Sequence, residues 1–362
     1  MARVVGKRMR RIASSIVLGV SIASVTSCRA QSPDSPMRAG TEMVRTDPGV
    51  PRVLWAGPRS IRVLGRNVVL NGFRRGGHYS DMAGPLRRLD TTDGLYSFDD
   101  HLTGVSAPNL GPDFPEVWVA VFAVETRGDA ATIAFVPFLR VTRFDPASRR
   151  AWFDSRSGTL EPTAFRNRSV LVCQEDGAFS WRVVDATDNS AEALTLRSAG
   201  TRLAPGDFLL PAPARSRRFK YLCSLKLDYS PAVGGRTRGE WRNFTISQGR
   251  TQSYVGNPFG DIRSPNLREL RFTGHVSPLA TGVFGSAQAY LLSSGGGPAY
   301  FYLSHDAANH VIASVGSDRT SGWGDGGSTP ITAAFGERQS LWGAVNSAEA
   351  VGRFVIQGWT EE

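Results

Sequence analysis

The sequence predicts an all-β protein with two or three antiparallel, sandwich-like domains. Apolar and polar residues alternate in short runs, which is the side-chain period of a half-buried strand. In addition, the 362 residues include 39 glycines and 21 prolines, and turn signals recur about every eight to twelve positions, a spacing typical of sandwiches and barrels. Only residues 191–196 and 265–270 have a weak helical pattern, and neither stretch is long enough for three helical turns.

The first 28 residues have the layout of a leader for export. Five basic residues and no acid occur in the first 11 positions, and an apolar run follows over residues 12–25. The run has 14 residues and contains serines, whereas a membrane-spanning helix needs about 20 apolar residues. The sequence therefore predicts a cleaved signal peptide instead of a permanent span.

Val25, Thr26 and Ser27 lead directly into Cys28. This arrangement resembles the lipobox of bacterial lipoproteins. The resemblance implies that Cys28 is acylated, that the chain is cut just before it, and that the lipid anchors the protein to a membrane. The residue after Cys28 is Arg29 and not an aspartate. In that family, the lack of an aspartate there implies the outer membrane if the host is Gram-negative. The alternative is an ordinary secretory signal in which the cysteine has no role.

Composition and strand spacing divide the chain into five segments. After the leader, a polar stretch rich in proline and serine predicts a flexible tether. The predicted segments are a signal peptide at 1–27, a tether at 28–50, a β domain at 51–150, a second β domain at 151–268 and a C-terminal β-sandwich at 269–362.

The clearest strands are expected at residues 116–124 and 131–141, and the sequence between them predicts that they form a hairpin. Pro137 would make the second of them an edge strand or place a bulge in it. Residues 288–292 and 299–303 read as another hairpin, around three consecutive glycines. In residues 219–227, regular alternation would put four side chains on one face, namely Tyr221, Cys223, Leu225 and Leu227.

The charge pattern argues against a nucleic-acid partner. The formal net charge is +10, but five positive charges lie in the leader. Arginine supplies 39 of the 42 basic residues, and these are spread along the chain among many acids. A GC-rich genome explains this bias better than an arginine-lined phosphate surface.

Two cysteines remain after Cys28, at Cys173 and Cys223. In an exported protein such a pair can form a disulfide. Both also lie in apolar, strand-like runs, so the alternative interpretation is that they are buried free thiols.

Catalytic motifs are mostly absent from the sequence. It contains neither a G-x-S-x-G elbow nor an H-E-x-x-H pair, and His305 and His310 do not have zinc-ligand spacing. We therefore expect no metal and no cofactor. The acids that would serve a glycoside hydrolase cannot be chosen by spacing, because they come from different strands; the candidates are Asp99, Asp100 beside His101, Asp185 and Asp188.

Aromatic residues are dense in the last 75 residues. Alternation places Tyr300 and Tyr302 on the same face of one strand, where they can contact a ligand. Trp342 and Trp359 are expected in the core. Trp323 lies in a glycine-rich loop and is the preferred ligand contact, because an aromatic ring offers an apolar face for stacking.

The C-terminal half resembles the accessory β domains of bacteriophage tail fibres and tail spikes. The similarity covers residues of about 205 to 362, and Cys223 stands where the family pattern has glycine. It is carried by the runs at 217–225, 241–244, 249–254, 276–281, 289–292, 300–304, 330–342 and 354–359.

The resemblance implies a structural or receptor-binding module, in that family often a homotrimer. Together with Cys28, it leads us to expect a lipid-anchored envelope protein that acts without catalysis, as a structural module or by binding a glycan or a protein receptor. The alternative is an anchored hydrolase acting on polysaccharide or peptidoglycan.

Lipidation is tested by metabolic labelling with a fatty-acid probe. We expect the wild-type chain to be labelled and the Cys28→Ser chain to remain unlabelled, because the thiol is the acylated group. Equal labelling of both chains would contradict the prediction.

Overall fold

The computed structural model describes residues 52–361 with gaps. Cys28, the leader, the tether and Trp323 lie outside the described residues. The residues left out between 52 and 361 are 65–67, 73–86, 90–93, 106–107, 109, 111–115, 126–130, 155–157, 159, 162–163, 167, 175–178, 189, 198–201, 215–217, 231–237, 242–243, 248–249, 254–257, 293–297, 309–310, 318–326 and 337–338.

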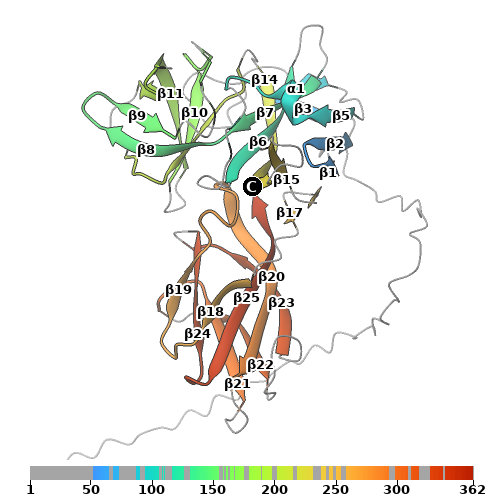
Figure 1. Ribbon diagram of the computed structural model, residues 1–362, viewed down its shortest axis with the longest axis vertical. Coiled ribbons are helices and arrows are strands. Elements are labelled where there is room, and N and C mark those ends of the chain that lie inside the picture. The colour runs from blue at the N-terminus through green and yellow to red at the C-terminus, as the bar shows by residue number, and fades with distance from the viewer. Residues whose placement is uncertain are drawn as a thin grey trace, which may run out of the picture. The chain divides into compact units, whose positions relative to one another are not determined.

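The predicted all-β fold is confirmed, since most of the described residues lie in strands that pair into antiparallel sheets (Figure 1). Among them the α-helical part is one short turn, α1 (Phe98–His101). Residues 193–196 and 268–271, which overlap the two weakly helical patterns, are strands β12 and β19. Neighbouring strands override a weak local preference here.

The largest sheet has nine strands and combines segments far apart in the sequence. Strands from the first two predicted β segments therefore share it with strands from the third. In spatial order it contains β23 (Gly327–Ala334), β20 (Ala280–Leu291), β25 (Ala350–Glu361), β17 (Arg250–Ser253), β16 (Phe244–Ser247), β1 (Arg52–Gly57), β2 (Ser60–Leu64) and β5 (Gly94–Ser97), with β18 (Pro258–Ile262) also paired to β25.

Six further strands close into a barrel around a core of its own. Its strands are β8 (Leu139–Asp145), β9 (Arg150–Phe153), β10 (Ser169–Cys173), β11 (Phe179–Asp188), β12 (Ala193–Leu196) and β13 (Phe208–Pro211).

Two smaller sheets complete the fold. The first contains β4 (Arg87–Leu89), β3 (Val68–Gly72), β14 (Arg218–Ser230), β6 (Glu116–Glu125) and β7 (Ala131–Pro137), with β15 (Arg238–Trp241) paired to β14. The second, called the four-stranded sheet below, contains β19 (Arg268–Arg271), β24 (Ser340–Val345), β21 (Ala299–Ser304) and β22 (Val311–Ser317).

Strand β6 is buried on both faces, which explains its almost unbroken apolar sequence. Trp118 and Phe122 point into one hydrophobic core, and Val119 and Val121 point into another. β6 pairs with β7 as the sequence predicted. β7 ends at Pro137 at the edge of its sheet, because proline cannot donate to a further ladder. β8 begins at Leu139, after one intervening residue.

The alternation predicted for residues 219–227 breaks at one point. The pairing of β14 with β6 shifts register between Tyr221 and Cys223, which inserts an extra residue into β14. As a result, Cys223 belongs to the core on one side of the sheet, whereas Tyr221 packs against the core on the other. The prediction that these two side chains share a face was wrong.

The hairpin predicted between residues 288–292 and 299–303 is also wrong. β20 pairs with β23 and β25, whereas β21 pairs with β22 and β24 (Figure 1). The glycine-rich connection therefore joins two different sheets. Both strands contribute to one core, where Ala289 and Leu291 join Phe301 and Leu303.

Close approach of the two sheets requires glycine on β25. A Cβ atom on Gly352 would collide with the ring of Phe301. Because Phe301 fills that space, the inner face of β21 is fixed against β25. Alternate residues of β21 then face outward.

Strand β25 connects the nine-stranded sheet to the sheet that contains β6 and β14. Along its length it pairs with β20, β17 and β18 (Figure 1). Trp359, only 2% exposed, contacts Trp118 of β6 edge to face, with ring centroids 5.2 Å apart. The end of β25 therefore packs on the sheet that contains β6 and β14.

Candidate binding surface on the four-stranded sheet

The outer face of the four-stranded sheet carries aromatic side chains. In β21 burial alternates, so that Ala299, Phe301 and Leu303 are buried. Tyr300 is 40% exposed and Tyr302 is partly buried on the opposite face. The prediction that the two tyrosines share a face agrees with this alternation.

The two tyrosine rings lie nearly parallel. Their centroids are 6.3 Å apart and their planes differ by 24°. Across the sheet, Tyr302 is paired with Ala344 on β24 and Ser314 on β22. Because both neighbours are small, they leave room around the Tyr302 ring.

Tyr300 is held by contacts at its backbone and at its ring. The side-chain oxygen of Asn346 accepts a hydrogen bond from the backbone N–H of Tyr300 at 2.8 Å. The backbone N–H of Asn346 donates to the Tyr300 carbonyl at 3.1 Å. The Asn346 amide nitrogen donates to the Pro298 carbonyl at 2.7 Å. Cross-strand from Tyr300 is Gly316, where a Cβ atom would lie 2.7 Å from Cε1 of the tyrosine ring. The ring therefore occupies space that only glycine leaves open.

Trp342 lies next to these tyrosines and not in the core. It is only partly buried, whereas its neighbour Leu341 is fully buried. Trp342 is cross-strand from Ser304 and from Glu269, so it is a diagonal neighbour of Tyr302 on the outer face. The expectation that Trp342 is a core residue was wrong, and alternation through Leu341 was the signal that could have placed it.

Other aromatic candidates have different positions. Trp359 is in the core, as expected. Tyr290 is on β20, in the nine-stranded sheet, where the Arg353 guanidinium lies 5.7 Å from its ring centroid and donates to its hydroxyl at 3.3 Å. Trp323 lies outside the described residues, so its role stays a prediction.

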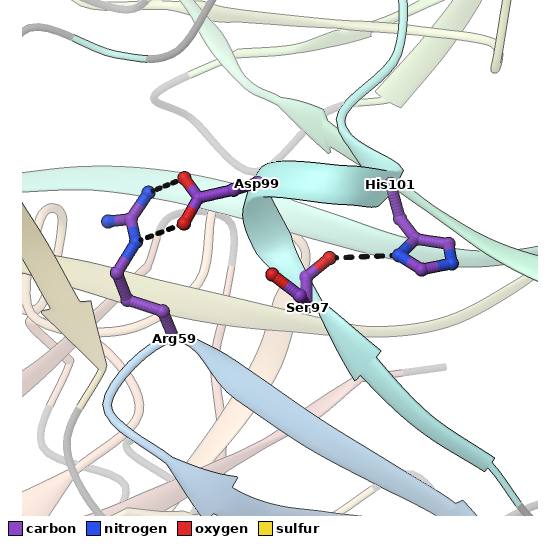
Figure 2. Close-up of polar contacts among 4 residues, drawn as sticks. All are labelled: Arg59, Ser97, Asp99 and His101. Carbon is purple, nitrogen blue, oxygen red and sulfur yellow. Dashed lines mark hydrogen bonds and ion pairs between the residues drawn. The ribbon is translucent and has the colours of Figure 1, made fainter.

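Asp99 and His101 do not face each other. Figure 2 shows Asp99 turned toward Arg59, which binds it with two guanidinium nitrogens, one of them at 2.9 Å. His101 points the other way, and its Nδ1 lies 3.0 Å from the carbonyl oxygen of Ser97. Since a carbonyl can only accept, this nitrogen carries the proton. The Arg59–Asp99 ion pair connects the β1–β2 turn to α1.

Two of the other acidic candidates, Asp185 and Asp188, are also paired with arginines, whereas Asp100 is an exposed residue of α1. Asp185 pairs with Arg197 at 3.3 Å, and Asp188 pairs with Arg150. Hydrogen bonds from Ser190 and from the Ala191 N–H, with the charge of Arg150, lower the pKa of Asp188. A glycosidase acid needs a raised pKa instead.

The disulfide that the sequence allows between Cys173 and Cys223 is not formed. Both cysteines are free and buried. Cys173 lies on β10 in one core, and Cys223 lies on β14 in another. Burial raises the pKa of both thiols, so these are unreactive core residues. The second reading of the sequence, buried free thiols, is confirmed.

In the described part of the chain, no three histidine, cysteine or acidic side chains gather as metal ligands. Within the same residues, no helix is long and apolar enough to cross a membrane.

A buried polar cluster at the end of β25 has no signal in the local sequence pattern. Glu361 is 9% exposed and accepts hydrogen bonds from the Tyr221 hydroxyl at 2.7 Å and from the Ser224 N–H at 3.1 Å. Trp359 Nε1–H donates to its other oxygen at 3.1 Å, and the Ser277 hydroxyl also donates to it. The register shift in β14 is what turns Tyr221 and Ser224 to the same side.

We call this set of five residues the Glu361 cluster. Burial raises the pKa of Glu361 and outweighs the four hydrogen bonds, which lower it. Burial also raises the pKa of Tyr221, with a further contribution from the charge of Glu361. All four groups around the carboxylate are donors, so the cluster is a closed structural contact.

No protein-family model matches the chain, and no curated protein matches it in a sequence search.

The Glu361 cluster generates a pH-dependent prediction. A raised pKa means that the folded state binds the proton more tightly than the unfolded state. The stability that this proton contributes is fully present below the ordinary value of 4.5 and is lost as the pH rises through the folded-state pKa. We expect the difference in unfolding free energy between wild type and Glu361→Gln to change in the wild type's favour as the pH falls through this window.

Urea unfolding of both chains between about pH 4 and pH 8 measures this difference. A difference that is constant with pH, or that changes in the opposite direction, would contradict the raised pKa.

Proposed function

We propose that this protein is a lipid-anchored binding protein of the cell envelope that holds a glycan on the outer face of its four-stranded sheet, without catalysis. The observation that carries the proposal is the pair of nearly parallel rings of Tyr300 and Tyr302 on the solvent side of β21.

Sugar rings suit such a surface because their C–H faces stack on aromatic rings while their hydroxyl groups need polar partners. Tyrosine supplies both an apolar face and a polar tip. Ser314, exposed and cross-strand from Tyr302, adds a hydroxyl that can donate or accept. Trp342 extends the aromatic face beyond Tyr302.

The aromatic face is also held in place before a ligand arrives. Asn346 and Gly316 fix the position of Tyr300 through its backbone and its ring. An ordered side chain loses less conformational entropy on binding, which favours affinity. An exposed ring held in this way is better explained by recognition than by core packing.

Membrane anchoring is the second part of the proposal. The basic residues, the short apolar run and the small residues before Cys28 support it. A lipid on Cys28 would keep the sandwich at the envelope, at the outer membrane if the host is Gram-negative. The resemblance to receptor-binding β domains of phage tail fibres agrees with a binding role.

The hydrolase alternative has less support. Three of its four candidate acids, Asp99, Asp185 and Asp188, are bound to arginines. Glu361, whose pKa is raised, is enclosed by hydrogen-bond donors.

Binding is tested on a glycan array with the full-length chain and two variants, Tyr300→Ala and Tyr302→Ala. We expect each variant to lose roughly tenfold in affinity for the best glycan, because each removes one stacking ring. The melting temperature should stay within about 4 °C of wild type, since neither side chain is in the core.

The matched control is Trp55→Ala. Trp55 is an aromatic residue 39% exposed on β1, close to the exposure of Tyr300, and its loss should leave glycan binding unchanged. Binding that survives both tyrosine substitutions would refute the site. Binding that falls equally in the control would refute its location.

A further inference from the structure

We infer that the ligand of this face is an uncharged, linear glycan that places two consecutive sugar rings along β21, one on Tyr300 and one on Tyr302. The inference rests on the proposed function and extends it to the chemical class and the smallest unit of the ligand.

The spacing of the tyrosines carries the first part of the inference. Residues two apart on a strand are separated by about 6.6 Å along its axis, and the two ring centroids are 6.3 Å apart. This separation is too large for both rings to stack on one sugar. It is comparable to the step between neighbouring rings of an extended glycan chain. The ring planes differ by only 24°, so the two rings are nearly parallel, and we infer that one extended chain contacts both of them.

The charge of the surface carries the second part. Around the tyrosines, the outer-face positions of β21, β22 and β24 hold Ser314, Gly316, Trp342 and Ala344, all uncharged. On the outer face, the nearest charge in the pairing pattern is Glu269, cross-strand from Trp342, and Arg271 donates to its carboxylate at 2.9 Å. These two charges compensate each other. Arg268, cross-strand from Gly343, falls on the opposite face by alternation. An acidic glycan would require uncompensated basic groups, so the surface suits a neutral one.

A substitution at Gly316 can separate the contributions of the Tyr300 and Tyr302 rings to glycan binding. A Cβ atom at this position would lie 2.7 and 2.9 Å from two atoms of the Tyr300 ring, so Gly316→Ala must move that ring. The ring is the outer end of a side chain and can move without disturbing the core. Tyr302 is cross-strand from Ser314 and not from Gly316, so its ring should stay in place.

The test measures affinity by calorimetry for N-acetylglucosamine and its β-1,4-linked oligomers of two, three and four residues, and for the matching glucose series. In the series that binds, we expect roughly a tenfold gain from one ring to two, the value of one more stacking contact, and little gain beyond. Gly316→Ala should lose most of the gain from the second ring and keep affinity for a single sugar. Gly57→Ala, whose Cβ has room, is the matched control and should behave as wild type.

The outcomes separate this inference from the function on which it rests. Equal affinity for one and two rings would overturn the inference but leave glycan binding intact. A full second-ring gain in Gly316→Ala would overturn the assignment of that ring to Tyr300. Tighter, salt-dependent binding of oligogalacturonate would overturn the uncharged class. If the glycan array and both oligomer series show no binding, the proposed function fails as well.

Discussion

The insertion of the end of β25 against the sheet of β6 and β14 is the contact on which the rest of the fold depends. Trp359 stacks edge to face on Trp118, and the Glu361 carboxylate takes hydrogen bonds from Tyr221 and Ser224. Burying a carboxylate is costly unless its oxygens are hydrogen-bonded. Four donors meet that requirement here, and removing one would leave charge poorly solvated in a buried site.

The same strand also positions the proposed binding face. Further back along β25, Gly352 makes room for Phe301, and Phe301 lies between Tyr300 and Tyr302 on β21. The inward residue is fixed by packing, so its two outward neighbours are fixed by the alternation of the strand. A residue of the core thus sets where the exposed rings stand. The polar clamp of Asn346 and the open space at Gly316 complete the arrangement.

Local alternation was enough to predict the all-β class, the positions of most strands and the shared face of Tyr300 and Tyr302. It failed where the outcome depends on a distant partner. The pairing of β21, the register shift after Tyr221 and the burial of Glu361 are set by strands many residues away, and no local pattern encodes them. The choice between a disulfide and buried free thiols was open in the sequence for the same reason, because it depends on Cys173 and Cys223 lying in different cores. Trp342, expected in the core, lies on the outer face, since the alternation of β24 turns it away from the side on which Leu341 is buried.

Native-state hydrogen exchange of Trp359→Ala tests most directly whether the end of β25 joins the sheets. If it does, the slowest amides of β14 and β6 lose protection together with those of β20 and β25, because removing a buried tryptophan costs about 3–5 kcal/mol. Trp55→Ala should leave both sets unchanged. Loss of protection confined to β20 and β25, with β14 and β6 exchanging as in wild type, would contradict the account.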